Sequence, residues 1–230
     1  MVAAKRGILY IVWGNGADAA LERSMQSVRA VYPEMPIHVE RMDPVRSLLN
    51  KVRMAVLSPF ESTLYLDADT IVLGNLDFGF EKAEQFGLAC CICECPWMRR
   101  YSHAHGDRIE YNTGVLFFTA KSRPVFDAWE QLADKTPMTS TWINERGEPR
   151  WATMDDQPSF ALAVEACGVN PFVLPINFNL RPMFHRSFFA PVKIWHEYID
   201  PPPGLMELSQ ACESGQRPVT FFEMFDPKKK

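Results

Sequence analysis

The sequence has no hydrophobic run long enough to cross a membrane, and it has no excess of positive charge. A membrane span needs roughly 18 continuous apolar residues or more, so we expect no transmembrane segment. Asp and Glu number 28 against 24 Lys and Arg, for a formal charge of −4, which argues against a nucleic-acid-binding protein that relies on a basic surface. Glycine is scarcer than proline, at 12 residues against 18, and a collagen-like repeat is excluded.

What the sequence does have is a large apolar and aromatic content. Hydrophobic residues make up 47% of the 230 residues, and aromatic residues make up 12%. A chain of this length and composition can bury a sizeable core, which rules out a disordered protein. No internal repeat and no linker-like change of composition is visible. We therefore expect a single domain over residues 1–230.

Four of the six cysteines lie in one short apolar run that predicts a strand. Alternation along that strand places Cys90 on one face and Cys91, Cys93 and Cys95 on the other. Neighbours two residues apart on a strand are poorly placed to bridge each other. We expect a reduced chain with buried thiols and a cytoplasmic location.

Apolar segments with strand and helix patterns alternate along the chain. Strands are expected at 7–13, 37–40, 63–67, 86–93, 114–120 and 171–175. Helices are expected at 18–31, 46–57, 122–134 and 157–167. This alternation predicts an α/β fold in which a mostly parallel, mixed sheet is flanked by helices on both faces.

Two polar connections, 96–111 and 136–156, are longer than compact domains usually contain without a functional reason. We expect both to be irregular loops near an active site. After residue 175 the chain becomes rich in proline and aromatic residues, with a possible short helix beyond 201–203.

The segment TLYLDADTIVL carries the strongest chemical signal. Asp67 and Asp69 end an apolar strand, and ligands in open α/β sheets gather beyond the carboxyl ends of the strands. Two carboxylates separated by the small Ala68 can converge on a hard divalent cation, which can in turn neutralise a diphosphate. The alternative is that both are ordinary turn residues.

Four stretches in order resemble one enzyme family. KVRMAVLSPFESTLYLDADTIVLGNLD at 51–77 is similar to the donor-site segment of the family 8 glycosyltransferases, the glycogenin-like and lipopolysaccharide galactosyltransferase-like enzymes. YNTGVLFF at 111–118, DDQPSFAL at 155–162 and KIWHEY at 193–198 follow in the family's order. The resemblance implies the GT-A fold of nucleotide-diphospho-sugar transferases. It also implies a nucleotide- and metal-binding half at 1–120 and an acceptor-side half with the C-terminal tail at 121–230.

The resemblance also implies roles for particular residues. Asp67, Asp69 and His196 would bind Mn²⁺ or Mg²⁺, and Asp156 and Gln157 would be the catalytic pair beside the anomeric carbon. The donor-binding residues it implies are Val12, Gly14, Lys51, Asp67, Ala68, Asp69, Asn112, Thr113, Gly114, Asp156, Gln157 and His196. From the residues alone, a lone histidine such as His196 is more often structural than a metal ligand. Asp155 or Asp156 could also cap the helix that follows, and a capping role is compatible with a catalytic one.

The implied reaction is metal-dependent transfer of a hexose from a nucleotide-sugar with retention of anomeric configuration. UDP-hexose is the default donor, and the acceptor is a saccharide, a lipid-linked sugar or a protein. Asp156 and Gln157 would stabilise the oxocarbenium charge, and cation neutralisation of the diphosphate would be the largest electrostatic contribution.

The sequence departs from the family at two places. The family's glycine and lysine after the histidine are absent, because His196 is followed by EYIDPPPG. The threonine and aromatic residue that frame uracil align with Val12 and Ala17, which leaves the base open. Cations for the diphosphate or an acceptor could instead come from the 96–111 loop, which carries Arg99, Arg100, His103, His105 and Arg108.

Two other functions compete with the transferase hypothesis. The string LYLDADTIVL also resembles the first motif of haloacid-dehalogenase-type phosphatases, in which Asp67 would be the nucleophile and Asp69 an acid/base. Two strands precede it here, whereas that motif normally closes the first strand. The missing lysine after His196 also allows a non-catalytic nucleotide-sugar-binding protein.

Overall fold

The computed structural model describes residues 5–94, 108–136, 139–143, 146–153, 156–185 and 187–223. Several residues singled out from the sequence lie outside these ranges, namely Cys95, Arg99, Arg100, His103, His105 and Asp155. No helix among the described residues is long and apolar enough to span a membrane.

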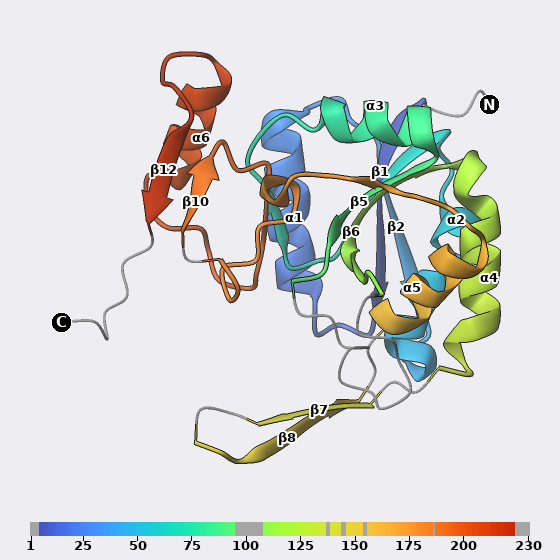
Figure 1. The fold of residues 1–230 in the computed structure, drawn as a ribbon. Helices are drawn as coiled ribbons and strands as arrows, with labels where there is room; N and C mark the ends of the chain where they lie inside the picture. Colours follow the sequence, from blue (N-terminus) through green and yellow to red (C-terminus); the bar gives the residue numbers. More distant parts are fainter. Residues whose placement is uncertain are drawn as a thin grey trace.

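A six-stranded sheet with the order β2-β1-β3-β6-β5-β9 forms the centre of the structure (Figure 1). Its strands are β1 (Arg6–Trp13), β2 (Ile37–Met42), β3 (Ser62–Leu66), β5 (Leu88–Ile92), β6 (Tyr111–Thr119) and β9 (Phe172–Val173). β1 pairs in parallel with β2 and β3, and β5 pairs in parallel with β9. β6 runs antiparallel to both of its neighbours, β3 and β5. The mostly parallel, mixed sheet expected from the sequence is confirmed.

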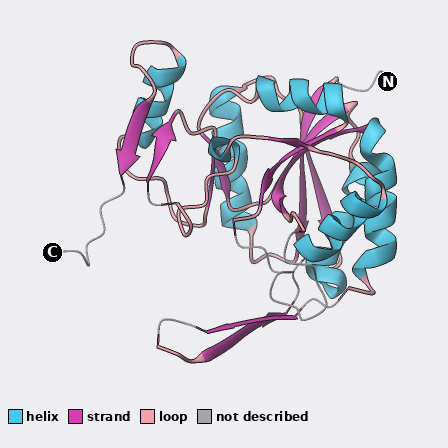
Figure 2. Ribbon diagram, in the orientation of Figure 1, coloured by secondary structure: helices cyan, strands magenta, loops and turns pink. Residues whose placement is uncertain are grey.

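Helices lie on both sides of this sheet (Figure 2). They are α1 (Asp18–Val31), the 3-10 helix η1 (Pro44–Arg53), α2 (Met54–Leu57), α3 (Asp77–Phe86), the 3-10 helix η3 (Ala120–Ser122), α4 (Arg123–Ala133) and α5 (Gln157–Ala166). α1 and α3 pack in the cluster that contains Ile8 and Tyr10 of β1. η1, α4 and α5 pack in the cluster that contains Leu9 and Ile11 of the same strand. A strand buried on both faces must be apolar at every position, which explains its unbroken apolar run.

The buried thiols follow the same alternation. Cys90 packs in the cluster with α4 and α5, and Cys91 packs in the cluster with α1 and α3. These two cysteines therefore lie on opposite faces, as predicted. Cys90, Cys91, Cys167 and Cys212 are free thiols.

Three short antiparallel pairs lie outside the main sheet. β4 (Thr70–Val72) pairs with β11 (Ile194–His196), β7 (Thr139–Ile143) with β8 (Pro149–Thr153), and β10 (Ser187–Ala190) with β12 (Thr220–Glu223). β10, β12 and α6 (Leu205–Glu213) pack in one apolar cluster with β4 and β11, and Figure 1 shows them at the opposite side of the picture from α4. The 3-10 helix η4 (Ile176–Phe178) lies between β9 and β10 in the chain.

The structure corrects the sequence predictions at three places, and a fourth correction concerns a helix that was not predicted. The segment 136–156 is not wholly irregular, because it contains the β7–β8 hairpin. The chain after residue 175 holds three strands that were not expected. The helix predicted at 46–57 is mostly 3-10 and is kinked at Ser47, whose φ is 45°.

Helix α3 was missed entirely. Gly79 lies inside it, and glycine disfavours a helix interior by roughly 0.5–1 kcal/mol relative to alanine. A Cβ at Gly79 would collide with the ring of Phe117 on β6. The close packing of α3 against β6 therefore requires a glycine at this position, and that glycine makes the sequence of the segment look less helical.

Candidate active site

The site begins at the turn between β3 and β4. The Thr70 backbone N–H and hydroxyl both donate to the Asp67 carbonyl oxygen, at 3.2 and 2.8 Å. Ser24 Oγ of α1 lies 3.1 Å from the Thr70 hydroxyl and 2.8 Å from the Tyr10 hydroxyl, and all three residues are buried. This buried hydrogen-bonded chain fixes the turn that carries Asp67 and Asp69.

His196 reaches the same turn through the β4–β11 pairing, in which it lies opposite Thr70. Its Nε2 is 3.4 Å from Asp69 Oδ1 and 3.9 Å from Asp67 Oδ2. One ligand atom from each of these three residues lies within 4.8 Å of the others. The structure thus brings together the three residues that the resemblance implied as metal ligands.

Gly114 leaves the room in which these side chains converge. Its carbonyl oxygen accepts from the Asp67 backbone N–H at 2.8 Å, so β6 runs directly beside the turn. A Cβ at this position would lie 2.6 Å from Asp67 Oδ2 and would also collide with the ring of His196. Only glycine fits here without displacing two of the three candidate ligands.

Two buried side chains contact the Asp67 carboxylate. Lys51 Nζ lies 2.9 Å from the Asp67 carboxylate and 3.6 Å from Asp156 Oδ2, and the Tyr65 hydroxyl donates to Asp67 Oδ1 at 2.7 Å. Burial by itself would lower the pKa of Lys51, but Asp156 and Asp67 outweigh it and raise that pKa. Lys51 is therefore a fixed buried cation that two carboxylates share.

The two other carboxylates of the cluster are tuned in opposite directions. Burial raises the pKa of Asp156, and the nearby Lys51 only partly opposes this. Burial also acts to raise the pKa of Asp69, but the hydrogen bond and charge of His196 and the charge of Lys51 lower it overall. Asp69 is therefore the carboxylate that stays ionised more readily.

Side-chain amides form the neighbouring part of the site. Asn112 Nδ2 donates to Gln157 Oε1 at 3.0 Å, and its Oδ1 accepts from the Gly114 N–H at 2.9 Å. The Thr113 hydroxyl donates to Asp156 Oδ2 at 2.8 Å. Asp156 occupies the N-cap position of α5, but its side chain makes no capping hydrogen bond. The capping interpretation of Asp156 is therefore wrong.

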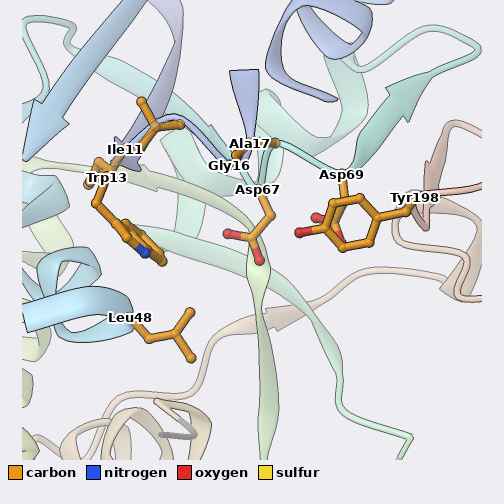
Figure 3. Close-up of a pocket in the computed structure, with 10 residues that line it drawn as sticks. Ile11, Trp13, Gly16, Ala17, Leu48, Asp67, Asp69 and Tyr198 are labelled. Atoms are coloured by element: carbon orange, nitrogen blue, oxygen red, sulfur yellow. The ribbon is translucent and has the colours of Figure 1, made fainter. Parts of the chain in front are cut away.

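A pocket of about 400 Å³ opens beside Asp67, Ala68 and Asp69. Figure 3 shows Trp13 and Leu48 on one side of Asp67, and Tyr198 beside Asp69 on the other. The lining residues are Ile11, Val12, Trp13, Gly16, Ala17, Leu48, Asp67, Ala68, Asp69 and Tyr198. Gly14 is not among them and forms an exposed turn after β1 with φ 61°.

The sequence reasoning missed several residues that the structure places here. Tyr65 could have been found, because it lies two residues before Asp67 on the same strand face. Trp13 ends a strand at the pocket edge, which is a weaker signal. Tyr198 follows His196 in a segment that Arg23 of α1 holds through the carbonyl oxygens of Glu197 and Tyr198, at 3.1 and 2.6 Å.

Of the cations expected from the 96–111 loop, only Arg108 is described, and it forms an ion pair with Glu165 of α5. Asn179 also lies in the site, and its Oδ1 is 2.7 Å from His196 Nδ1. No pattern in the sequence predicted it.

No protein-family model and no curated protein matches the chain significantly. Solved structures do match it. The galactosyltransferase LgtC, in complex with donor and acceptor sugar analogues, has a TM-score of 0.55 at 15% identity, over 90% of this chain and 95% of that chain. Mouse xyloside xylosyltransferase 1 has a TM-score of 0.55 at 14% identity, over 86% and 99%. A glycosyltransferase involved in glycosylation of the major capsid of PBCV-1 has a TM-score of 0.52 at 12% identity, over 91% and 99%.

The chain has the GT-A glycosyltransferase fold. The fold implied by the four family-like stretches is thereby confirmed. At these identities the likeness establishes the fold alone, and an activity must be argued from the residues. The GT-A fold also argues against the phosphatase alternative, since the Asp67 strand here is the third along the chain and pairs antiparallel with β6.

The Asp67, Asp69 and His196 cluster fits a divalent cation. Two carboxylates and one imidazole make an oxygen-rich donor set, which suits Mg²⁺ or Mn²⁺. The absence of a side chain at Gly114 keeps the space between the donors open. These three residues therefore suit a metal centre at the carboxyl end of β3, where ligands bind in open α/β sheets.

Proposed function

We propose that the protein is a metal-dependent, retaining glycosyltransferase that moves a hexose from a nucleotide-diphosphate sugar, with UDP-hexose as the default donor. The observation that carries the proposal is the convergence of Asp67, Asp69 and His196, since the first two of these residues also line the pocket. Mn²⁺ or Mg²⁺ held by these residues would supply the positive charge that neutralises a departing diphosphate. Within the ranges described here, no other group of three such residues could hold a metal.

The pocket suggests how the donor lies. Trp13 and Leu48 offer an apolar surface away from Asp69, and a nucleobase would pack there (Figure 3). The diphosphate would then lie at the end lined by Asp67 and Asp69. Ala17, which aligns with the aromatic residue that frames uracil in the family, has no ring. Trp13 supplies an aromatic ring in the same pocket.

The sugar would lie beside the buried side chains of Asn112, Asp156 and Gln157. Asn112 and Gln157 present amide groups that match sugar hydroxyls, because each amide carries both a donor and an acceptor. Asp156 is held by the Thr113 hydroxyl and faces the fixed cation of Lys51. Its negative charge would stabilise an oxocarbenium centre rather than attack it, which is compatible with retention.

We propose a single catalytic domain, with 1–120 supplying nucleotide and metal contacts and 121–230 the acceptor side. The two halves share the centre, since Asp67 and Asp69 come from the first and His196, Asp156 and Gln157 from the second. The acceptor would be a saccharide, a lipid-linked sugar or a protein.

A second candidate is a non-catalytic nucleotide-sugar-binding protein. One observation favours it: the stretch after His196 carries Tyr198 into the pocket and has no lysine there. Incubation with UDP-hexoses and Mn²⁺ separates the two, because an enzyme releases UDP and a binder only binds. Release of phosphate from simple phosphate esters would instead support the phosphatase alternative.

The metal assignment is tested by calorimetry of UDP binding with and without Mn²⁺. Replacing Asp67→Asn together with Asp69→Asn should abolish the Mn²⁺-dependent part of UDP affinity. Asp134→Asn is the control, since Asp134 lies on the surface and pairs with Arg46. Unchanged Mn²⁺-dependent affinity in the double variant would refute the proposed centre, and NMR showing an inverted anomeric centre in the product would refute retention.

A further inference from the structure

A continuous chain of side-chain hydrogen bonds connects the amide cluster to the candidate metal ligand His196. Gln157 Oε1 accepts from Asn112 Nδ2 at 3.0 Å, and Asn112 Oδ1 accepts from Asn179 Nδ2 at 2.8 Å. Asn179 Oδ1 then lies 2.7 Å from His196 Nδ1. These four side chains are all buried, so water competes little for their bonds.

The direction of every bond in this chain is set at one end by the backbone. The Gly114 N–H can only donate, and it donates to Asn112 Oδ1 at 2.9 Å. The oxygen of the Asn112 amide must therefore point toward Gly114 and Asn179. Asn179 must then present its NH₂ to Asn112, which leaves its carbonyl oxygen facing His196.

An amide oxygen can only accept, so the His196 atom that faces it must carry a hydrogen. In a neutral ring with the hydrogen on Nδ1, the lone pair lies on Nε2. Nε2 is the nitrogen near the carboxylates, 3.4 Å from Asp69 Oδ1. Of the two neutral ring forms, the amide chain therefore selects the one whose Nε2 can bind a metal on the side of Asp67 and Asp69. The hydrogen bond from Nε2 to Asp69 belongs to the protonated ring, and a cation bound at Nε2 would take the place of that hydrogen.

We propose that Asn179 is a positioning residue that holds His196 in the Nδ1–H form, with the Nε2 lone pair directed into the Asp67–Asp69 pair. The proposal rests on the proposed function, because it assigns a task within the same metal centre. Through Asn112, the same chain of bonds also sets the orientation of the Gln157 amide. One backbone N–H thus orders both the metal side and the sugar side of the site.

Two substitutions at Asn179 separate its acceptor role from its packing. Asn179→Leu keeps the approximate volume but removes the acceptor for Nδ1–H, and Mn²⁺ affinity should fall by about 10–100-fold. Asn179→Asp gives up the hydrogen bond to Asn112 Oδ1 but keeps the acceptor for Nδ1–H, and it should retain most of the Mn²⁺ affinity. Asn177→Leu is the matched control, since Asn177 lies two residues earlier and its amide donates to Pro191 O.

Mn²⁺ affinity is measured by calorimetry on the full chain, with no activity readout. Weak binding by Asn179→Leu, with near-normal binding by Asn179→Asp and Asn177→Leu, would support the inference. Normal binding by Asn179→Leu would overturn it, as would equal losses in Asn179→Leu and Asn179→Asp. If the unsubstituted protein binds no Mn²⁺, the proposed function fails, whatever the tautomer.

The tautomer itself can be read without metal and without any Asn179 variant. Long-range ¹H–¹⁵N correlations of the metal-free protein, at a pH where the ring is neutral, distinguish Nδ1–H from Nε2–H. The His196 signals are assigned by their loss in His196→Gln. An Nδ1–H ring is the expected result, and an Nε2–H ring would overturn the inference even if the leucine variant failed to fold.

Discussion

The six-stranded sheet and the β4–β11 pair differ in size and in what they carry. The sheet is covered on both faces by apolar clusters that include the rings of Trp129, Phe160 and Phe126. The β4–β11 pair has three residues on each strand, yet it places His196 beside the turn that carries Asp67 and Asp69. Most of the buried apolar side chains therefore lie in the sheet region, while the candidate metal ligands meet where the end of β3 lies beside the β4–β11 pair. Substitutions should affect the two separately.

The largest expected effect is on the sheet side. Trp129 is fully buried, packs at 4.8 Å from the Phe160 ring centroid and donates to Ser159 Oγ at 2.9 Å. Trp129→Ala should lower the free energy of unfolding by about 3–5 kcal/mol, measured by urea denaturation. The Mn²⁺ affinity of the folded variant should be unchanged. A large loss of Mn²⁺ affinity in protein that remains folded would contradict the separation of the two regions.

The next effect is on the metal side. Gly114→Ala should weaken Mn²⁺ binding by about 10–100-fold, since a Cβ there displaces Asp67 and His196. Gly16→Ala is the matched control, because it lines the same pocket and a Cβ at Gly16 meets no atom within 4 Å. Calorimetry should show a loss for the first variant only, and equal affinities would contradict the steric argument.

A smaller effect is expected at the apolar end of the pocket. Trp13→Ala should reduce UDP affinity by about 0.5–1.5 kcal/mol through the lost ring contact, beyond any loss from reduced burial. Trp13→Phe should recover most of it. Mn²⁺ affinity without nucleotide should not change in either variant, and an unchanged UDP affinity in Trp13→Ala would place the base elsewhere.

The smallest effect is on stability and depends on pH. Because the pKa of Asp156 is raised above its ordinary value of 3.8, the folded chain holds this proton more tightly than the unfolded chain does. The folded protein therefore loses stability through ionisation of Asp156 as the pH rises from 3.8 through the raised pKa of the folded state. The Tm of Asp156→Asn relative to the unsubstituted protein should increase from about pH 4 to about pH 7. A relative Tm that falls over this range would contradict the direction of the shift, and the variant should also lose transfer activity.

The sequence predicted elements well where the local pattern and the burial agreed. Helix α1 spans Asp18–Val31, as predicted from the helical spacing of its apolar residues. Strands β1 and β3 lie within one residue of their predicted bounds, since strands buried on both faces show as short apolar runs. Prediction failed where packing overrode the local signal, as at Gly79 in α3.

The candidate site divides in the same way. Asp67 and Asp69 are two residues apart, so their proximity follows from the chain alone. His196 could be named from the family resemblance, but its approach to them depends on the β4–β11 pairing. Asn179 could not be found from the sequence, because its proposed role depends on the contacts of its amide with Asn112 and His196, which are far from it in the chain.

By itself the sequence determined the kind of fold, the acidic turn after a buried strand and the family to compare it with. These follow from local periodicity and from residues close together in the chain. Tertiary structure alone decided that His196, Lys51 and Asn179 meet at that turn, and that Gly114 leaves them room. Contacts between residues far apart in sequence depend on strand pairing and packing, which no local pattern encodes.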